Sequence, residues 1–310
     1  MRSRERSRPL KVGIQLPEIE RLVRWPEIAA MARLAEKVGF DSLWVGDHLL
    51  YRPPDEEAKG PWEAWSTLAA LAAITERVEI GPLVASTSFH NPQMLAKKAA
   101  TIDDISSGRL ILGLGAGWNE AEYRAFGYPF DHRVSRFEEA FTIIRTLLRE
   151  GYIDFQGAFY QAPDCQLVPR GPRPDGPPLM VGSEGERMLR ITLPHVDAWN
   201  AWYAWFGNRP EGLVPLLQRL DAACEEVGRD PATLERTCAV LVGLSGAVGR
   251  VSGIVRAPAS PPLTGTAEEL AETLRAYAAI GVGHVQLVLD PNTLEAIEEF
   301  APVLQILDRT

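Results

Sequence analysis

Short, almost continuously apolar runs recur along the chain, separated by longer segments in which apolar residues follow a helical period. A run without alternating polar positions is typical of a strand that is covered on both faces. Eight such runs are predicted to be strands, beginning near Val12 (VGIQL), Ser42 (SLWVG), Val78 (VEIGPLVA), Leu110 (LILGLG), Leu179 (LMVG), Asp197 (DAWN), Cys238 (CAVLVG) and His284 (HVQLVL).

The segments between these runs are predicted to be helices, because their apolar residues recur every three or four positions. The clearest stripes lie within 95–105, 137–148, 213–227 and 294–304. Thr266 and Glu269 have the spacing of a capping box, and Gly281 is placed to end the helix that follows. Eight strands that alternate with helices predict an α/β fold, the (β/α)8 barrel, since a doubly wound sheet usually has fewer strands.

Two stretches are too long to be ordinary connections. Residues 153–178, after the fourth predicted strand and its helix, are rich in proline and aromatic residues, and residues 245–265 follow the seventh strand. Insertions of this length in a barrel are often lids or binding loops. Residues 1–10 are expected to form a flexible basic tail, and 11–310 a single barrel domain.

Composition and charge narrow the classes of function. Hydrophobic residues make up 46% of the chain, which excludes disorder, and 32 Lys and Arg against 41 Asp and Glu give a net charge of −9. An acidic balance argues against nucleic acid as a partner. No apolar stretch of membrane-spanning length or secretory leader is seen, and the three dispersed cysteines form no metal motif. We therefore expect no metal, no membrane partner and a cytoplasmic location.

Polar residues and glycines gather where the predicted strands end, which is where barrels of this kind carry their chemistry. The fifth strand runs into Gly182-Ser-Glu-Gly185, followed by Arg187 in the next helical turn. Such a turn either presents backbone N–H groups to a phosphate or is a glycine-rich turn whose arginine faces solvent.

Other chemistries fit less well. The sequence GLGAG after the fourth strand lacks the third glycine of a dinucleotide loop, because Trp118 stands there. There is no GxSxG motif of a serine hydrolase. Asn119-Glu120 could supply one carboxylate of a glycosidase, but the seventh strand supplies no second one.

Taken together, five stretches resemble the bacterial luciferase-like monooxygenase superfamily, and most of all its oxidoreductases that use the deazaflavin coenzyme F420. They are GFDSLWVGDHLL (39–50), VEIGPLVASTSFHNPQMLAKKAATIDDISSGRLILGLGAGWNEAEYRAFGYPF (78–130), RFEEAFTIIRTLL (136–148), PPLMVGSEGERMLRITLPHVDAWN (177–200) and GTAEELAETLRAYAAIGVGHVQLVL (265–289).

This resemblance implies hydride transfer between C5 of F420 and a small organic substrate in a homodimeric enzyme. It implies a cofactor phosphate at Gly182, Ser183, Gly185 and Arg187, with Glu184 turned away from it. It places Pro82, Leu83, Ser86, Gly117 and Trp118 beside the cofactor, and it implies a cis peptide bond between Pro82 and Leu83. Asp47 and His48 lie beside the ring, where His48 is either a proton-transfer residue or a hydrogen-bonded spacer.

Some alternatives stay open at this point. A two-component monooxygenase that uses FMN belongs to the same superfamily, while a barrel hydrolase and a non-catalytic flavin-binding protein come from other classes. The aromatic cluster Trp199, Trp202, Tyr203, Trp205 and Phe206 is either a substrate wall or a dimer contact.

Overall fold

The computed structural model describes residues 8–53, 57–249 and 260–309. Its main sheet has nine parallel strands in the order β3-β2-β1-β11-β10-β9-β8-β5-β4. The strands are β1 (Lys11–Gln15), β2 (Ser42–Val45), β3 (Glu79–Pro82), β4 (Ala85–Ser86), β5 (Leu112–Gly115), β8 (Leu179–Val181), β9 (Ala198–Ala201), β10 (Glu235–Gly243) and β11 (Val282–Asp290). A parallel bridge between Ile80 and Leu110 joins the two ends of the sheet and closes it into a barrel.

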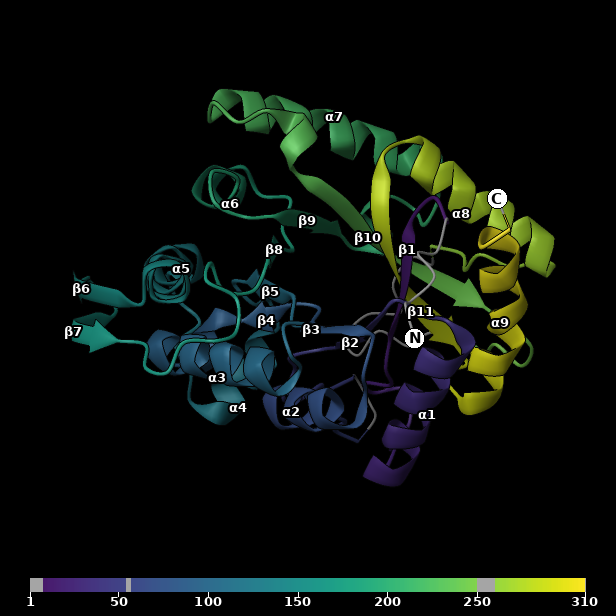
Figure 1. Ribbon diagram of the computed structural model, residues 1–310, viewed down its shortest axis with the longest axis horizontal. Coiled ribbons are helices and arrows are strands. Elements are labelled where there is room, and N and C mark those ends of the chain that lie inside the picture. The colour runs from purple at the N-terminus through teal and green to yellow at the C-terminus, as the bar shows by residue number, and fades with distance from the viewer. Residues whose placement is uncertain (1–7, 54–56, 250–259, 310) are drawn as a thin grey trace.

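Helices connect these strands and cover the outside of the barrel, as Figure 1 shows. They are α1 (Trp25–Val38), α2 (Ala64–Ile74), α3 (Pro92–Ile105), α4 (Glu120–Phe126), α5 (Arg133–Glu150), α6 (Glu186–Thr192), α7 (Pro210–Glu226), α8 (Ala267–Ala279) and α9 (Leu294–Leu307). Three short 3-10 helices lie at Thr87–Phe89, Tyr203–Trp205 and Pro231–Thr233. The predicted capping box is present, since Thr266 and Glu269 each accept the other's backbone N–H.

The predicted (β/α)8 barrel is confirmed, and its eight predicted strands are found. The run from Val78 is divided between β3 and β4, which occupy one position in the barrel. The barrel interior is not uniformly apolar, because Ser42, His284, Thr237 and Gln286 are buried there and hydrogen-bonded. This polar layer lies beneath the carboxyl ends of the strands.

The insertion after the fourth strand holds a feature that the sequence pattern did not predict. It contains the antiparallel hairpin of β6 (Tyr152–Gln156) and β7 (Gln161–Gln166), which projects beside α5 in Figure 1. Of the insertion after the seventh strand, residues 250–259 lie outside the described residues.

The N-terminal residues are only partly described. Residues 1–7 of the expected tail lie outside the described part of the chain. Residues 8–10 are packed against the barrel rather than extended from it, because Leu10 is buried and the Arg8 guanidinium bonds to Asp41 and Asp308 at 2.9 and 2.7 Å. These residues therefore belong to the fold.

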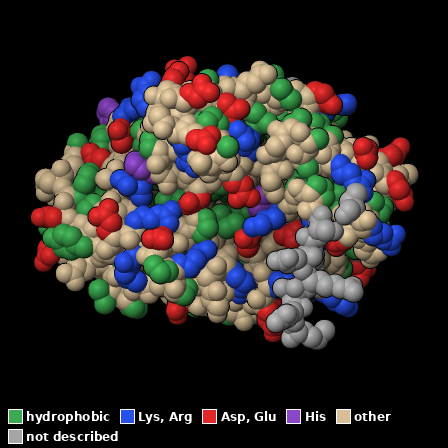
Figure 2. Space-filling view, turned by 45° about the horizontal axis from the view of Figure 1, so that its top comes forward, with side chains coloured by type: hydrophobic (Ala, Val, Ile, Leu, Met, Phe, Trp, Pro, Cys, Tyr) green, Lys and Arg blue, Asp and Glu red, His purple; other side chains and the backbone are tan. Residues whose placement is uncertain are grey.

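Acidic and basic side chains are interspersed over the face shown in Figure 2. None of the helices in the described ranges is long and apolar enough to cross a membrane.

Candidate active site

A cavity of about 610 Å³ opens at the carboxyl end of the barrel strands. It is lined from the ends of six strand positions by Gln15, Glu18, Ile19, Asp47, His48, Tyr51, Leu83, Val84, Ala85, Ser86, Gly115, Ala116, Gly117, Trp118, Glu122, Gly182, Ser183, Glu184, Gly185, Met188, Asn200, Trp202, Tyr203, Ala204 and Trp205, and by Ser260. A site of this size and place is where a barrel enzyme binds a small molecule.

Asp47 ties the loop after β2 to β4 and to the segment that follows it. Its Oδ2 accepts the backbone N–H of Ser86 at 2.9 Å and lies 3.0 Å from Nε2 of His90. The side chain is buried, so both contacts are shielded from water. Asp47 thus fixes the position of His48, the next residue in the chain.

His48 lies on the cavity wall between two carboxylates. Its Nδ1 is 2.9 Å from Oε1 of Glu122, and its Nε2 is 3.9 Å from Oε1 of Glu18. The second oxygen of Glu122 accepts the backbone N–H groups of Leu49 and Leu50 at 2.8 and 3.3 Å. Glu122 therefore orients the imidazole and leaves Nε2 toward the cavity.

The surroundings of His48 favour its protonated form. Burial by itself lowers the pKa of His48, but the hydrogen bond with Glu122 and the charges of Glu18, Glu122 and Asp47 outweigh it. The pKa of His48 is consequently raised above its ordinary value of 6.5. A histidine that gains a proton in this setting is stabilised by its neighbours, which suits a group that accepts protons.

Glu18 is held in place by two hydrogen bonds, from Tyr51 and Gln15, and Gly46 leaves room for its carboxylate. It accepts the hydroxyl of Tyr51 at 2.8 Å through Oε1 and the side-chain amide of Gln15 at 3.1 Å through Oε2. The carboxylate lies over Gly46, where a Cβ would be only 2.7 Å from Oε1. A glycine is therefore required at position 46 if the carboxylate is to stay where it is.

Most of the cofactor residues expected from the sequence line the cavity. These are Leu83, Ser86, Gly117, Trp118, Gly182, Ser183, Glu184 and Gly185. Gly117 has a φ of +74°, and a Cβ there would be 2.0 Å from the hydroxyl oxygen of Tyr123 and 2.5 Å from Oγ of Ser86. Only glycine fits that turn.

Two expected residues lie elsewhere. Pro82 ends β3 in register with Val45 and is not part of the cavity lining. The Arg187 guanidinium bonds to Oγ of Ser135 at 3.0 Å and to Oε2 of Glu138 at 2.8 Å, both on α5. It faces this outer helix because it follows Glu186 in the first turn of α6, on the side turned away from the cavity.

The expected cis peptide bond is shifted by one residue. The sequence comparison placed it between Pro82 and Leu83, whereas the structure has it between Leu83 and Val84. The expected position was therefore wrong by one residue; Leu83 and Val84 lie between β3 and β4, and both line the cavity.

The loop after β8 presents backbone groups to the cavity. A Cβ at Gly185 would meet no described atom closer than 3.9 Å, so the space beside it is open. Trp199 supports the loop from below, because its indole Nε1 donates to the carbonyl of Ser183 at 2.7 Å. Glu184 lies 3.8 Å from the Arg219 guanidinium on α7, which offsets its charge.

The aromatic cluster is divided between the cavity and the core. Trp202, Tyr203 and Trp205 line the cavity, while Trp199 and Phe206 are buried. Across the cavity mouth, Trp118 meets the ring of His48 edge-on at 5.6 Å. The cavity thus has aromatic walls at both sides, which favours the interpretation as a substrate wall.

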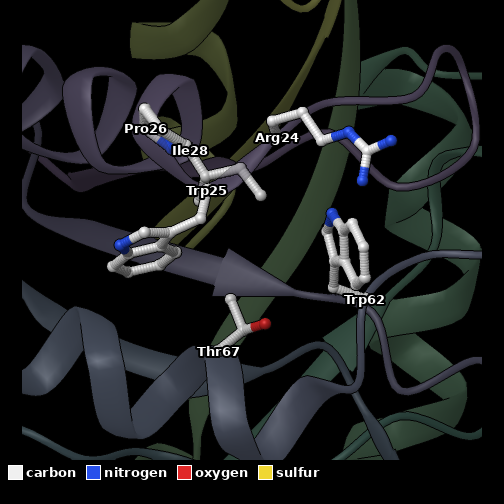
Figure 3. Close-up of a pocket in the computed structure, with 6 residues that line it drawn as sticks. All are labelled: Arg24, Trp25, Pro26, Ile28, Trp62 and Thr67. Atoms are coloured by element: carbon white, nitrogen blue, oxygen red, sulfur yellow. The ribbon is translucent and has the colours of Figure 1, made fainter.

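A second cavity, of about 330 Å³, lies at the start of α1 and α2. Figure 3 shows the indoles of Trp25 and Trp62 on opposite sides of it, with Thr67 between them. Arg24 is its sole charged lining residue, and no acid or histidine faces it in the described structure. It lacks groups that move protons, so we assign the chemistry to the larger cavity.

Sequence reasoning missed two residues of this site, Glu122 and Glu18. The carboxylate singled out after the fourth strand was Glu120, whose side chain is exposed and pairs with Arg124. Glu122 is on the opposite side of the same short helix and is buried. The one sequence signal for Glu18 was its place three residues after Gln15, at the end of β1.

The chain matches a known protein family over most of its length. The sequence profile described as luciferase-like monooxygenase matches residues 10–245. The chain belongs to the luciferase-like monooxygenase family. As a member of the luciferase-like monooxygenases it is an oxidoreductase or monooxygenase.

Individual relatives in the luciferase-like monooxygenase family differ in their activities, and a dehydrogenase and a monooxygenase are both among them. An F420-dependent glucose-6-phosphate dehydrogenase of Amycolatopsis mediterranei is 36% identical over 154 residues, which are 48% of this chain and 45% of that protein. The pyrimidine monooxygenase RutA of Rhizobium rhizogenes is 34% identical over 173 residues, 54% of this chain and 47% of that protein. The matches thus span about half the length of these relatives.

A solved structure of an F420-dependent secondary alcohol dehydrogenase, in complex with an F420–acetone adduct, superimposes with a TM-score of 0.80. The two chains are 20% identical, and the superposition covers 96% of this chain and 99% of that one. At this identity the likeness shows the shared barrel fold.

Proposed function

We propose that the protein is an F420-dependent oxidoreductase that transfers a hydride between the cofactor and a small alcohol or carbonyl compound. The observation that carries the proposal is the His48–Glu122 pair on the cavity wall. Oxidation of an alcohol releases a hydride from carbon and a proton from oxygen, and the proton needs an acceptor within hydrogen-bond reach. His48 is suited to be that acceptor.

The cavity fits a deazaflavin. Its volume is that of a site for a medium-sized ligand, Leu83 and Val84 offer an apolar backing, and the Gly182–Gly185 loop offers an open cradle for a phosphate. The backbone N–H groups of Ser183 and Glu184 donate to no other described residue. We place the phosphate there without a contribution from Arg187. When bound, the cofactor supplies a carbon that accepts or returns the hydride.

The protein's own groups handle the proton. With Nδ1–H donated to Glu122, Nε2 of His48 is free to take the proton of the substrate hydroxyl as the carbonyl forms. The two carboxylates stabilise the resulting imidazolium, and the aromatic walls reduce the access of water. In the reverse direction the same nitrogen returns the proton to the carbonyl oxygen.

A side-by-side titration with F420 and FMN tests the cofactor, following quenching of the tryptophan fluorescence. We expect F420 to bind at least about tenfold more tightly than FMN, a difference of about 1.4 kcal/mol. The reverse order would favour the second candidate, an FMN-dependent monooxygenase; the likeness to the pyrimidine monooxygenase RutA supports the monooxygenase part of that candidate. Binding of neither would contradict both proposals.

We further propose that residues 11–310, with residues 8–10 packed against them, act as one domain in a homodimer in the cytoplasm. The family resemblance supports the dimer. Sedimentation equilibrium measures the oligomeric state directly, and a monomer at all concentrations would contradict the proposed homodimer.

A further inference from the structure

Asn200 belongs to the wall of the larger cavity that β9 provides. Two positions earlier, Ala198 packs with Trp44 and Met180 in the apolar cluster inside the barrel. Side chains along a strand alternate between its two faces, so Asn200 points into the same interior, one step nearer the carboxyl end. Its side chain is only 4% exposed, and it lines the cavity. The amide is therefore a nearly buried polar group beside the space that a ligand would fill.

The barrel interior holds the amide of Asn200 in one orientation. Its Nδ2 donates to Oγ1 of Thr237 at 2.8 Å and to Oε1 of Gln286 at 2.7 Å, which uses both of its hydrogens. The Thr237 hydroxyl is itself directed at Sδ of Met180 at 3.6 Å, so its oxygen is left to accept. Reversal of the Asn200 amide alone would set its oxygen against the oxygen of Gln286. The nitrogen is thus fixed on the core side, and Oδ1 is turned to the cavity.

The oxygen of this amide lacks a hydrogen bond. No described residue donates to Oδ1 of Asn200. The atom is accessible from the cavity, in contrast to Nε2 of Gln286, which is also unpartnered but fully enclosed. A nearly buried acceptor costs free energy unless a donor reaches it. On the cavity side that donor is water in the empty site or a group of the molecule that binds there.

Asn200 and His48 lie on opposite walls of the cavity. Their strands, β9 and β2, are four positions apart in the eight-position barrel, whichever way round it is counted. A ligand that fills the space between these walls therefore meets one acceptor on each side. In the proposed reaction the substrate hydroxyl donates to His48. The donor that reaches Asn200 is then left to the cofactor, whose phosphate is proposed to lie in the loop after β8, the strand next to β9.

We infer that Oδ1 of Asn200 accepts the imide N–H of the cofactor ring, the N3–H group that lies between two carbonyls in deazaflavins and flavins alike. The inference rests on the proposed function, because it takes the larger cavity as the cofactor site. The imide stays protonated at neutral pH, and both partners are uncharged, so the contact needs no ionised group. A bond to a fixed amide restricts the rotation of the ring in its own plane, and Asn200 thereby helps to set where the reactive carbon lies.

Ring analogues that lack this one hydrogen test the inference. The probes are 5-deaza-FMN and FMN, each compared with the derivative that carries a methyl group on N3. Their dissociation constants are measured at pH 7 by quenching of the tryptophan fluorescence. We expect each N3-methyl derivative to bind the unchanged protein about 30-fold more weakly than its parent, because Oδ1 of Asn200 is then left buried without a donor.

Two variants assign this difference to Asn200. Asn200→Leu keeps nearly the size of the side chain but has no acceptor, and Asn200→Ala opens space through which water reaches Thr237 and Gln286. In both we expect a parent and its N3-methyl derivative to bind within about threefold of each other, because the parent has lost its bond. Ser183→Ala, which changes another polar residue of the lining, should leave the ratio as it is. Circular dichroism shows whether each variant is folded, and Asn200→Ala alone decides if Asn200→Leu is not.

The outcomes separate this inference from the proposed function. A ratio below about threefold in the unchanged protein, or one that persists at about 30-fold in a folded Asn200 variant, would overturn the inference even if 5-deaza-FMN binds tightly. Persistence in Asn200→Leu alone would trace the loss to crowding by the methyl group and would overturn it too. The expected pattern with FMN, in a protein that does not bind 5-deaza-FMN, would uphold the contact and overturn the choice of F420. Binding of neither parent would overturn both.

Discussion

The carboxylate of Glu122 holds His48 and the backbone that follows it at the same time. One oxygen lies 2.9 Å from His48 Nδ1, and the other accepts the N–H of Leu49 at 2.8 Å. The imidazole therefore cannot rotate without breaking a buried contact. The fold thus determines the direction in which Nε2 of His48 points.

Replacing Glu122 by glutamine is expected to change both the rate and its pH dependence. Loss of the negative charge removes one of the causes that raise the pKa of His48, so the pKa falls. Alcohol oxidation needs unprotonated His48, so the rise of kcat with pH moves to lower pH. The plateau should drop about tenfold to a hundredfold, because the neutral amide stabilises the imidazolium less well. A pH–rate profile with an unchanged inflection would show that Glu122 does not act on His48.

Replacing His48 itself by alanine should reduce turnover about a hundredfold or more while the far-ultraviolet circular dichroism stays native-like. The side chain accepts no backbone N–H and lies at the cavity wall, so its removal costs the fold little. Turnover close to that of the unchanged protein would identify His48 as a spacer.

Gly117 and Gly127 offer a matched pair for the turn beside the cavity. Both have a positive φ, +74° and +77°, but a Cβ at Gly127 meets no atom within 4 Å whereas one at Gly117 overlaps Tyr123 and Ser86. Gly127→Ala should cost about 1–2 kcal/mol of unfolding free energy, the penalty of the left-handed conformation. Gly117→Ala should cost at least about 2 kcal/mol more, and should also weaken cofactor binding. Equal losses in urea denaturation would argue against the close packing at Gly117.

The loop after β8 can be tested without disturbing the fold. Gly185→Ala places a methyl group in open space at a φ of −74°, so thermal stability should not change. If the loop cradles the phosphate, cofactor affinity falls about tenfold, because the ligand can no longer approach the backbone. Arg187→Ala, two residues away, should change affinity less than about threefold since its guanidinium pairs with Glu138. A large loss for Arg187→Ala alone would place the phosphate on the other side of α6.

His284 in the barrel interior makes the fold sensitive to acid. Burial, and to a lesser degree the charge of Lys11, lowers the pKa of His284 to about 3. Between pH 6.5 and 3, His284 binds a proton in the unfolded chain but not in the folded chain. The contribution of neutral His284 to the free energy of unfolding is therefore fully present above pH 6.5 and is lost as the pH falls toward 3. The free energy of unfolding falls by about 1.4 kcal/mol per pH unit over this window, and the total loss is roughly 5 kcal/mol. His284→Gln should flatten the fall of the urea midpoint over this window, and an unchanged slope would contradict the assignment.

The sequence predicted the barrel because the strands are covered on both faces and leave an unambiguous apolar run. The hairpin β6–β7 was not predicted, since its strands are largely exposed and Asp154 and Pro163 interrupt any alternation. The division of the third run into β3 and β4 was also not predicted, because the buried residues continue from one half into the other without a polar turn between them.

The candidate site could be predicted only where the chain itself brings residues to a strand end. Asp47 and His48 follow β2 directly, and the glycines follow β8 directly, so the barrel topology was enough to place them. Glu122 lies on a seven-residue helix without a single apolar face, so nothing local distinguishes it from Glu120. The direction of Arg187 depends on α5, which is about fifty residues earlier in the chain.

The contact between Glu18 and Gly46 has a consequence for sorting the relatives of this protein. A side chain at position 46 would displace the carboxylate even in a chain that retains a glutamate at position 18. Two chains can therefore share every polar residue of the site and still differ in its charge pattern. In an alignment of relatives, the residue at position 46 therefore indicates whether the carboxylate can occupy this position. A substrate preference should be inferred from one relative to another only after the residue at position 46 has been compared.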